Sequence, residues 1–234
     1  MQNHRMLGVL VIGQSPRPDL VDEFRRVLPA STNIVLRGVL DGLSLEEISC
    51  LAPTCAEDTL FTVLPSGVGV KVSHDAISTR ARSVVQALQQ EGCEWVAMCC
   101  TGEFPELHSL PVLFASRLHT QLAVAIGQDR RLGIYVPLPE QRTAAMQRWR
   151  ASGFQNLTVV PLVPKSAAAD IDAAASRMAA AQPDLIVYDC MAYDSALRAR
   201  ADAVTKRPAI LPISLLARVV AELSCSANAV STVA

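Results

Sequence analysis

The sequence predicts an α/β protein of two similar lobes, each built on a parallel sheet with helices on its faces, with a cleft between the lobes. Three observations favour this fold class. Short apolar runs alternate with segments of helical periodicity, as in parallel sheets. A unit of helix, turn, strand and cysteine occurs twice, about 90 residues apart. Half of the 234 residues are hydrophobic and 18% are charged, so the chain can bury a substantial core.

The predicted strands are short runs rich in Val, Ile and Leu that end near Gly, Pro or Cys. Near-continuous apolar character suits strands that are covered on both faces, so each run is expected to be a buried strand. In chain order the runs are Leu7–Ile12, Ile34–Leu36, Thr59–Leu64, Trp95–Met98, Leu132–Val136, Leu157–Leu162, Leu185–Tyr188 and Ala209–Leu211.

The predicted helices lie between these strands, and two of them carry clear start signals. Pro18 suits the first position of a helix. Ser44, with Glu47 three residues later, forms a capping box. The helices are Asp19–Val27, Ser44–Cys50, Asp75–Gln90, Pro139–Ala151, Ala168–Ala181, Asp194–Val204 and Ser214–Leu223.

The repeated unit predicts two lobes related by a pseudo-twofold axis. In one copy the strand ends in Cys-Cys-Thr-Gly, and in the other it ends in Asp-Cys-Met-Ala. We place the N-terminal lobe at residues 1–112 and the second lobe at residues 113–212, with the C-terminal helix 213–225 packing back on the N-terminal lobe. Ligands bind beyond the carboxyl ends of the strands in open α/β sheets, so both cysteines should meet at one cleft.

Composition excludes several classes of function. The net charge is −1 and no basic stripe or polybasic segment stands out, so neither nucleic acid nor a membrane surface is an expected partner. No stretch approaches the roughly 20 apolar residues of a membrane span, and the first apolar run is too short for a signal peptide. We therefore expect a cytoplasmic protein. Seven cysteines without a CxxC motif argue against a disulfide framework, and the four histidines lack metal-ligand spacing, so no metal is expected.

Cys100 is the first candidate for chemistry. It follows a predicted strand, and the backbone N–H groups and hydroxyl of Thr101 and Gly102 could hold a carboxylate. A helix start here would favour the thiolate. The alternative is a cysteine that only fills core space. Cys99 should point to the opposite side of the strand and belong to packing.

Cys190 is the second candidate, at the equivalent place in the repeat. Its polar neighbours are Asp189 and Tyr193, and Met191 and Ala192 complete the loop that could contact a substrate. Packing, with Asp189 capping a helix, is again the alternative. The occurrence of two cysteines at matching positions favours function for both.

The loop after the first strand borders the expected ligand crevice. There Gln14 and Ser15 could bind a substrate oxygen, and Arg17 could make a bidentate contact with a carboxylate. The alternative is a simple helix start, and both interpretations can hold. In the segment after the second strand, glycines permit positive φ and Asp41 either fixes the turn or contacts the ligand.

With these residues in view, the chain resembles the AroM family. The features that carry the resemblance span nearly the whole sequence in order. They are Ile12-Gly13-Gln14-Ser15-Pro16-Arg17-Pro18-Asp19, the turn Gly38-Val39-Leu40-Asp41-Gly42-Leu43, Cys100-Thr101-Gly102-Glu103-Phe104 and Asp189-Cys190-Met191-Ala192-Tyr193.

The AroM family is similar to the wider aspartate/glutamate/hydantoin racemase superfamily. That resemblance implies two flavodoxin-like lobes around a cleft and cofactor-independent chemistry with one cysteine from each lobe. Those racemases carry Cys-Asn-Thr in the first lobe and Gly-Cys-Thr in the second, whereas this chain reads Cys-Thr-Gly and Asp-Cys-Met. The absence of a threonine after Cys190 removes one expected carboxylate ligand.

We therefore expect a racemase or epimerase in which Cys100 and Cys190 act as acid and base at a carbon next to a carboxylate or carbonyl. The expected partner is a small carboxylate-bearing molecule, with no cofactor, and a homodimer is the commonest assembly for such a protein. Cysteine-dependent isomerisation and decarboxylation use the same site. A non-catalytic binding or regulatory protein with the same cleft is the alternative from another class.

Overall fold

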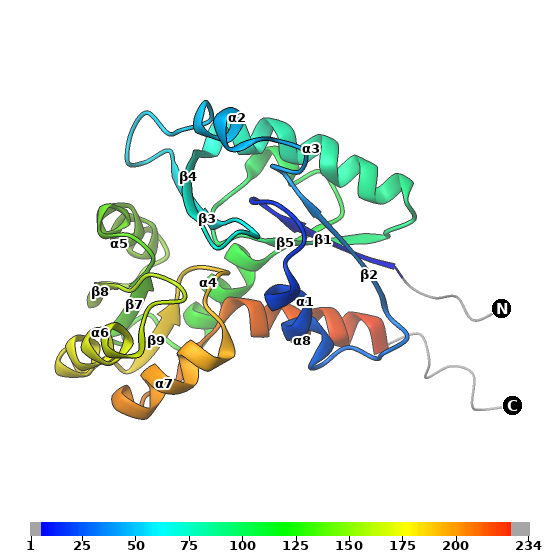
Figure 1. The fold of residues 1–234 in the computed structure, drawn as a ribbon. Coiled ribbons are helices and arrows are strands. Elements are labelled where there is room, and N and C mark those ends of the chain that lie inside the picture. The colour runs from blue at the N-terminus through cyan, green and yellow to red at the C-terminus, as the bar shows by residue number, and fades with distance from the viewer. Residues whose placement is uncertain (1–5, 226–234) are drawn as a thin grey trace, which may run out of the picture.

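The computed structural model describes residues 6–225 and contains two four-stranded parallel sheets and a separate hairpin (Figure 1). The first sheet has the order β2 (Asn33–Gly38), β1 (Met6–Val11), β5 (Trp95–Cys99) and β6 (Val112–Phe114). The second has the order β10 (Ala209–Ile210), β9 (Leu185–Tyr188), β7 (Leu132–Val136) and β8 (Leu157–Pro161).

The two sheets repeat one topology. Numbered by their order along the chain within each sheet, the strands run 2-1-3-4 in both, which is a doubly wound arrangement with its switch point between strands 1 and 3. The pairs at the switch points are β1 with β5 and β7 with β9, and all pairings within these sheets are parallel. The predicted fold class is confirmed.

Helices cover both faces of the first sheet. On one face lies α3 (His74–Gln90), which begins after the N-cap Ser73. On the other face α1 (Pro18–Arg25) and α4 (Ala115–Ile126) both pack against α8 (Pro212–Cys225), and this last helix lies against the first sheet.

The second sheet is also covered on both faces. The helix α5 (Arg142–Ala151) packs on one face, where Trp149 is buried against the strands. On the other face lie α6 (Ala168–Ala180) and α7 (Ser195–Thr205), which contact each other along their length. The single-turn helices η1 (Pro105–Leu107) and η2 (Pro139–Gln141) and the short helix α2 (Leu45–Ser49) complete the set, and α2 has the predicted capping box.

The strand period sorts side chains into different cores. In β1, Val9 and Val11 lie in the core shared with α1, whereas Leu10 lies in the core shared with α3. The same alternation places Cys99 and Cys100 in different cores. Cys99 therefore points away from Cys100 as predicted, but it does not belong to packing alone, because it also borders the cavity between the lobes.

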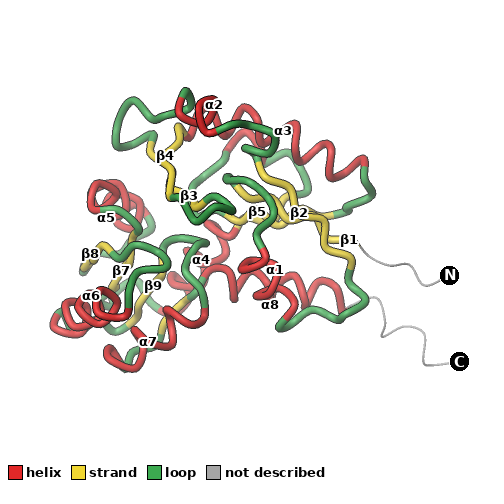
Figure 2. Tube along the Cα trace, in the orientation of Figure 1, coloured by secondary structure: helices red, strands yellow, loops and turns green. Residues whose placement is uncertain are grey.

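Two local expectations are corrected by the structure. Residues 59–64 were expected to form a strand buried on both faces, but β3 (Thr59–Val63) pairs antiparallel with β4 (Gly69–Ser73) in a hairpin outside both parallel sheets. Gly67, with φ +85°, allows the tight connection that an apolar pattern alone does not reveal. Figure 2 shows this hairpin between the first sheet and α5. The helix expected over residues 139–151 is divided into η2 and α5.

The chain passes between lobes through two elements that the sequence patterns did not single out, β6 and α4. Since β6 pairs with β5, the hydrogen-bonded first sheet continues to Phe114, two residues past the expected boundary at residue 112. The division of the chain into two domains stays a prediction. None of the helices within residues 6–225 combines the length and apolar character needed to cross a membrane.

Candidate functional site

A cavity of about 400 Å³ lies between the two lobes, at the carboxyl ends of the four switch-point strands. Ile12 and Cys100 border it from the first lobe, and Pro137 and Cys190 border it from the second. Each follows the end of β1, β5, β7 or β9. This is the crevice in which doubly wound sheets bind ligands, and here the crevices of two sheets face one another.

Cys100 lies directly after β5 and contributes one wall of the cavity. It is 7% exposed, and its Sγ accepts a hydrogen bond from the Gly102 N–H at 3.3 Å. Burial raises the pKa of Cys100 to about 11, while the Gly102 N–H and the positive charge of Arg148 act in the opposite direction. A pKa raised in this way favours the thiol form of Cys100 at neutral pH.

Cys190 occupies the matching place in the second lobe. It is 9% exposed, and its Sγ accepts a hydrogen bond from the Ala192 N–H at 3.4 Å. Burial raises the pKa of Cys190 to about 12, and the neighbouring Cys100 raises it further, whereas the charge of Arg17 lowers it. Each thiol thus has the same local design: a sulfur after a strand, held by the N–H group two residues later.

A hydrogen bond joins the two cysteine-bearing loops across the cavity. The Thr101 hydroxyl donates to the carbonyl oxygen of Asp189 at 3.3 Å. Because Thr101 follows Cys100 and Asp189 precedes Cys190, this contact fixes one cysteine loop against the other.

A buried charged cluster lies behind Cys190. The Asp189 carboxylate is fully buried, forms an ion pair with Arg148 and accepts a hydrogen bond from Trp149 Nε1 at 3.0 Å. His119 Nε2 lies 3.6 Å from the other carboxylate oxygen. Burial opposes ionisation of Asp189, yet the positive charge of Arg148 and the contacts with His119 and Trp149 keep the pKa of Asp189 well below its ordinary value.

Arg148 is a cavity residue that the sequence reasoning missed. Ala144 and Ala145 of the same helix line the cavity with it, as does Gln141 of η2. The two alanines leave room above the helix. Small residues one helical turn before an arginine were the signal in the sequence that could have indicated a cavity-lining arginine. It is a weak signal, because Arg142 and Arg150 in the same helix are exposed.

Arg17 lines the cavity as expected, but its side chain is already occupied. Its Nε and Nη2 donate to the two carboxylate oxygens of Asp19, each at 2.8 Å, and Nη1 donates to the Val63 carbonyl at 3.3 Å. The residue is only 5% exposed. Burial opposes ionisation of Asp19, but the bonds and charge of Arg17 and the charge of Lys165 lower its pKa.

The structure brings most of the expected binding residues to the cavity, while three do not line it. Thr101, Gly102, Met191 and Ala192 border the cavity together with both cysteines. Gln14 instead donates from Nε2 to the carbonyls of Leu40 and Leu43, the Ser15 hydroxyl donates to Asp41, and the Tyr193 hydroxyl donates to the Leu162 carbonyl. The polar groups of these three side chains form hydrogen bonds that join loops of the protein.

Asp41 joins the loop after β1 to the turn after β2, two segments that lie far apart in the sequence. Its carboxylate accepts hydrogen bonds from the Ser15 N–H at 2.6 Å, the Ser15 hydroxyl at 2.8 Å and the Gly38 N–H at 2.7 Å. A Cβ at Gly38 would lie 2.4 Å from the Gly13 carbonyl oxygen, so this glycine is required by close approach of two backbones. Gly42, with φ +78°, is the glycine that supplies positive φ.

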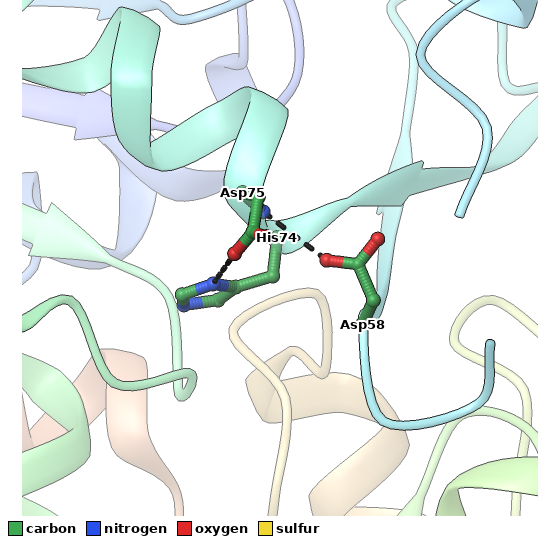
Figure 3. Close-up of side chains that lie close together, drawn as sticks. All are labelled: Asp58, His74 and Asp75. Atoms are coloured by element: carbon green, nitrogen blue, oxygen red, sulfur yellow. Dashed lines mark hydrogen bonds and ion pairs between the residues drawn. The ribbon is translucent and has the colours of Figure 1, made fainter. Parts of the chain in front are cut away.

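At the mouth of the cavity, one group of described residues has the side-chain types that bind metals. Figure 3 shows Asp58 beside His74 and Asp75, whose ligand atoms lie within 4.8 Å of one another. The polar atoms of these side chains already form hydrogen bonds and ion pairs around the start of α3. Asp58 accepts from the Asp75 N–H at 3.1 Å, and His74 Nε2 hydrogen bonds with the Glu103 carbonyl. The cluster therefore anchors α3 to the loop after Cys100.

The β3–β4 hairpin forms a further wall. Leu60, Phe61 and Thr62 line the cavity from β3, and Lys71 of β4 forms an ion pair with Glu140 of η2 in the second lobe. The cavity is thus enclosed by elements from both lobes.

Comparison with known proteins agrees with this architecture. A family model described as AroM protein matches residues 7–224. A search of curated proteins found no match. Many solved structures are similar, among them allantoin racemase from Klebsiella pneumoniae, with 16% identity, a TM-score of 0.61, and coverage of 95% of this chain and 88% of that one.

Two further solved structures have different reactions in their names. Arylmalonate decarboxylase is 13% identical with a TM-score of 0.60, and the match covers 95% of this chain and 93% of that one. The maleate isomerase Iso from Pseudomonas putida S16 is 11% identical with a TM-score of 0.61, and the match covers 94% of this chain and 92% of that one. At these identities the likeness shows the fold alone, which this chain shares with proteins named for racemisation, decarboxylation and isomerisation.

Proposed function

Because the chain belongs to the AroM protein family and has the fold of the aspartate/glutamate racemase superfamily, we propose that it is a cofactor-independent racemase or epimerase. Its substrate is a small molecule with a hydrogen on a carbon next to a carboxylate or carbonyl. The observation that carries this proposal is that Cys100 and Cys190, one from each lobe, line the same cavity at equivalent positions of a repeated topology.

In the proposed reaction one cysteine, as the thiolate, removes the proton from one face of the carbon. The bonding electrons pass into the adjacent carbonyl group and give an enolate. The other cysteine, as the thiol, returns a proton to the opposite face, so one proton is gained and one is lost and the configuration is inverted. Two groups on opposite sides of one carbon are the minimum that this inversion requires.

The enolate needs stabilisation, because a carbon next to a carboxylate is a weak acid. The backbone N–H groups at the starts of the loops after Cys100 and Cys190 are suitable donors, and Arg148 supplies a positive charge beside the cavity. Thr101 uses its hydroxyl to hold the two loops together. A substrate therefore meets donors that are already fixed in place.

The mechanism requires a thiolate, but burial raises the pKa of both thiols. With a pKa of about 11, Cys100 is ionised in roughly one molecule in a thousand at pH 8. The N–H group that contacts each sulfur and the arginine charges near them favour the thiolate. Proton removal thus draws on a small thiolate population, which makes the rate strongly pH dependent.

The same burial favours a second candidate function, a binding or regulatory protein that retains the cavity without turning over its ligand. Two thiols that stay protonated at neutral pH are compatible with binding alone. Isomerisation or decarboxylation by one cysteine is the closest chemical alternative, and proteins named for both reactions share the fold.

Deuterium exchange in D₂O tests the proposal. The protein is incubated with amino acids, hydroxy acids and hydantoins, and loss of the α-hydrogen is followed by NMR. We expect exchange that disappears in Cys100→Ser and in Cys190→Ser but persists in Cys93→Ser, because Cys93 is buried in the core away from the cavity.

Other outcomes separate the alternatives. Exchange that survives both active-site substitutions rules out these thiols as acid and base. Exchange that depends on one cysteine alone supports a single-cysteine reaction. Saturable binding without exchange for any compound supports the binding protein.

A further inference from the structure

Two arginines line the cavity, and they differ in how fully their donors are used. Arg17 is bound on three of its nitrogens by Asp19 and the Val63 carbonyl. Arg148 contacts Asp189 through Nη2, whereas its buried Nε has no hydrogen-bond partner among the described residues. Of its five N–H donors Arg17 uses three, and the residue is only 5% exposed. Among the described residues Arg148 uses one N–H donor, on Nη2, and although its Nε is buried, its side chain is 34% exposed beside the cavity.

The Arg148 guanidinium belongs to a side chain that lines the same cavity as the two cysteines. Its ion-pair partner Asp189 directly precedes Cys190, and its charge also acts on Cys100 in the opposite lobe. The Arg148 side chain is 34% exposed, although its partner carboxylate is completely buried. A ligand in the cavity can thus reach Arg148 without disturbing the buried side of the pair.

We propose that Arg148 binds the carboxylate of the substrate, so that the site selects acids over neutral molecules of the same shape. An arginine fork recognises a carboxylate through two parallel hydrogen bonds, and such charge-assisted bonds are stronger than neutral ones. This inference rests on the proposed function for the identity of the reacting cysteines, and it adds the residue that binds the substrate carboxylate.

Asp189 stays supported when Arg148 engages a ligand. Trp149 Nε1 continues to donate to one of its carboxylate oxygens at 3.0 Å, and His119 Nε2 lies 3.6 Å from the other. Trp149 thus holds one of the oxygens by a hydrogen bond, whereas the oxygen beside His119 has no hydrogen-bond partner among the described residues. Arg148 can therefore be shared between Asp189 and a substrate carboxylate, and need not leave one to reach the other.

The test compares acids with their isosteric amides, which differ mainly in charge. Binding of mandelate and mandelamide, and of lactate and lactamide, is measured by calorimetric or NMR titration at low ionic strength. We expect wild-type protein to bind at least one acid about 10- to 100-fold more tightly than its amide. In Arg148→Met this preference should fall to about twofold or less, while the affinity for the amide changes little.

Two further variants keep the test decisive. Arg150→Met removes an exposed arginine from the same helix and should retain the preference for acids. If Arg148→Met does not fold, the double variant Arg148→Met with Asp189→Asn removes both charges of the pair and is measured in its place. The same loss of preference is expected there.

The inference is overturned if wild-type protein shows no preference for either acid, if the preference survives removal of Arg148, or if Arg150→Met abolishes it equally. Because binding is measured without turnover, the result is independent of deuterium exchange. Preference for acids without exchange would retain the role of Arg148 and reject the enzymatic proposal. Exchange without such a preference would retain the enzymatic proposal and reject the role of Arg148.

Discussion

The hydroxyl of Thr101 donates a hydrogen bond to the carbonyl oxygen of Asp189 at 3.3 Å, and this contact joins the residue after Cys100 to the residue before Cys190. It crosses from one lobe to the other over 88 positions of the sequence. The relative position of the two thiols therefore depends on one side chain as well as on the packing of the lobes.

Replacing Thr101 by Val should preserve the shape of the side chain and remove this donor. We expect the stability to fall by about 1 kcal/mol and kcat for deuterium exchange to fall about tenfold, since small displacements of reacting groups are costly. Thr101→Ser retains the hydroxyl and should stay within about threefold of the wild-type rate. Wild-type activity in the valine variant would show that the lobes are positioned without this bond.

The pH dependence of exchange should reflect the raised thiol pKa values. The thiolate is the base, and burial places the pKa of Cys100 at about 11 and that of Cys190 at about 12. Because the fraction of thiolate rises with pH up to these values, kcat/KM should increase about tenfold per pH unit between pH 7 and pH 9. A plateau below pH 9 would contradict the assignment, because it would indicate a base with an ordinary or lowered pKa.

The ion pair of Arg148 with Asp189 should respond unequally to loss of its two partners. Arg148→Met leaves a fully buried carboxylate without its cation, and we expect a loss of about 3 kcal/mol at pH 7. Asp189→Asn leaves an arginine that already reaches solvent, and we expect a loss of about 1 kcal/mol. Urea unfolding of both variants measures the difference, and equal losses would contradict it.

The same ion pair predicts how the stability difference between wild type and Arg148→Met changes at acid pH. In the wild-type protein the pKa of Asp189 is lowered, so its contribution to stability is present above pH 4 and is lost as the pH falls through the folded-state pKa. Without Arg148, burial should raise the pKa of Asp189 above its unfolded value, and protonation then stabilises the fold. The stability difference between wild type and Arg148→Met should therefore shrink as the pH is lowered from 7 to 4.

Asp41 should matter for stability more than its position in a loop suggests. Asp41→Ala leaves the Ser15 N–H, the Ser15 hydroxyl and the Gly38 N–H without their acceptor, and we expect a loss of about 2 to 3 kcal/mol in urea unfolding. Asp22→Ala, at an exposed position of α1, is the matched control and should change stability by less than about 0.5 kcal/mol. A loss of the same small size at Asp41 would mean that the two loops are held by packing.

The alternation of apolar runs and helical segments was enough to predict parallel sheet, because a strand covered on both faces leaves a near-continuous apolar signal, and the repeated unit predicted that there are two lobes. The strands at residues 132–136 and 185–188 have the expected bounds. The hairpin at residues 59–73 was misread, since an apolar run does not reveal whether its hydrogen-bond partner is parallel or antiparallel. The short strand β6 gave too weak a pattern to be recognised.

The sequence by itself determined the strand-and-helix framework and the equivalence of Cys100 and Cys190, because periodicity and position after a strand are local properties of the chain. Only the tertiary structure decided which polar side chains face the cavity. It engages Ser15 and Gln14 in holding loops, and it directs Arg148 of α5 toward Asp189 and the cavity. The physical reason is that a hydrogen bond or ion pair requires two partners at short distance, and residues separated by many positions meet only when the sheets pack.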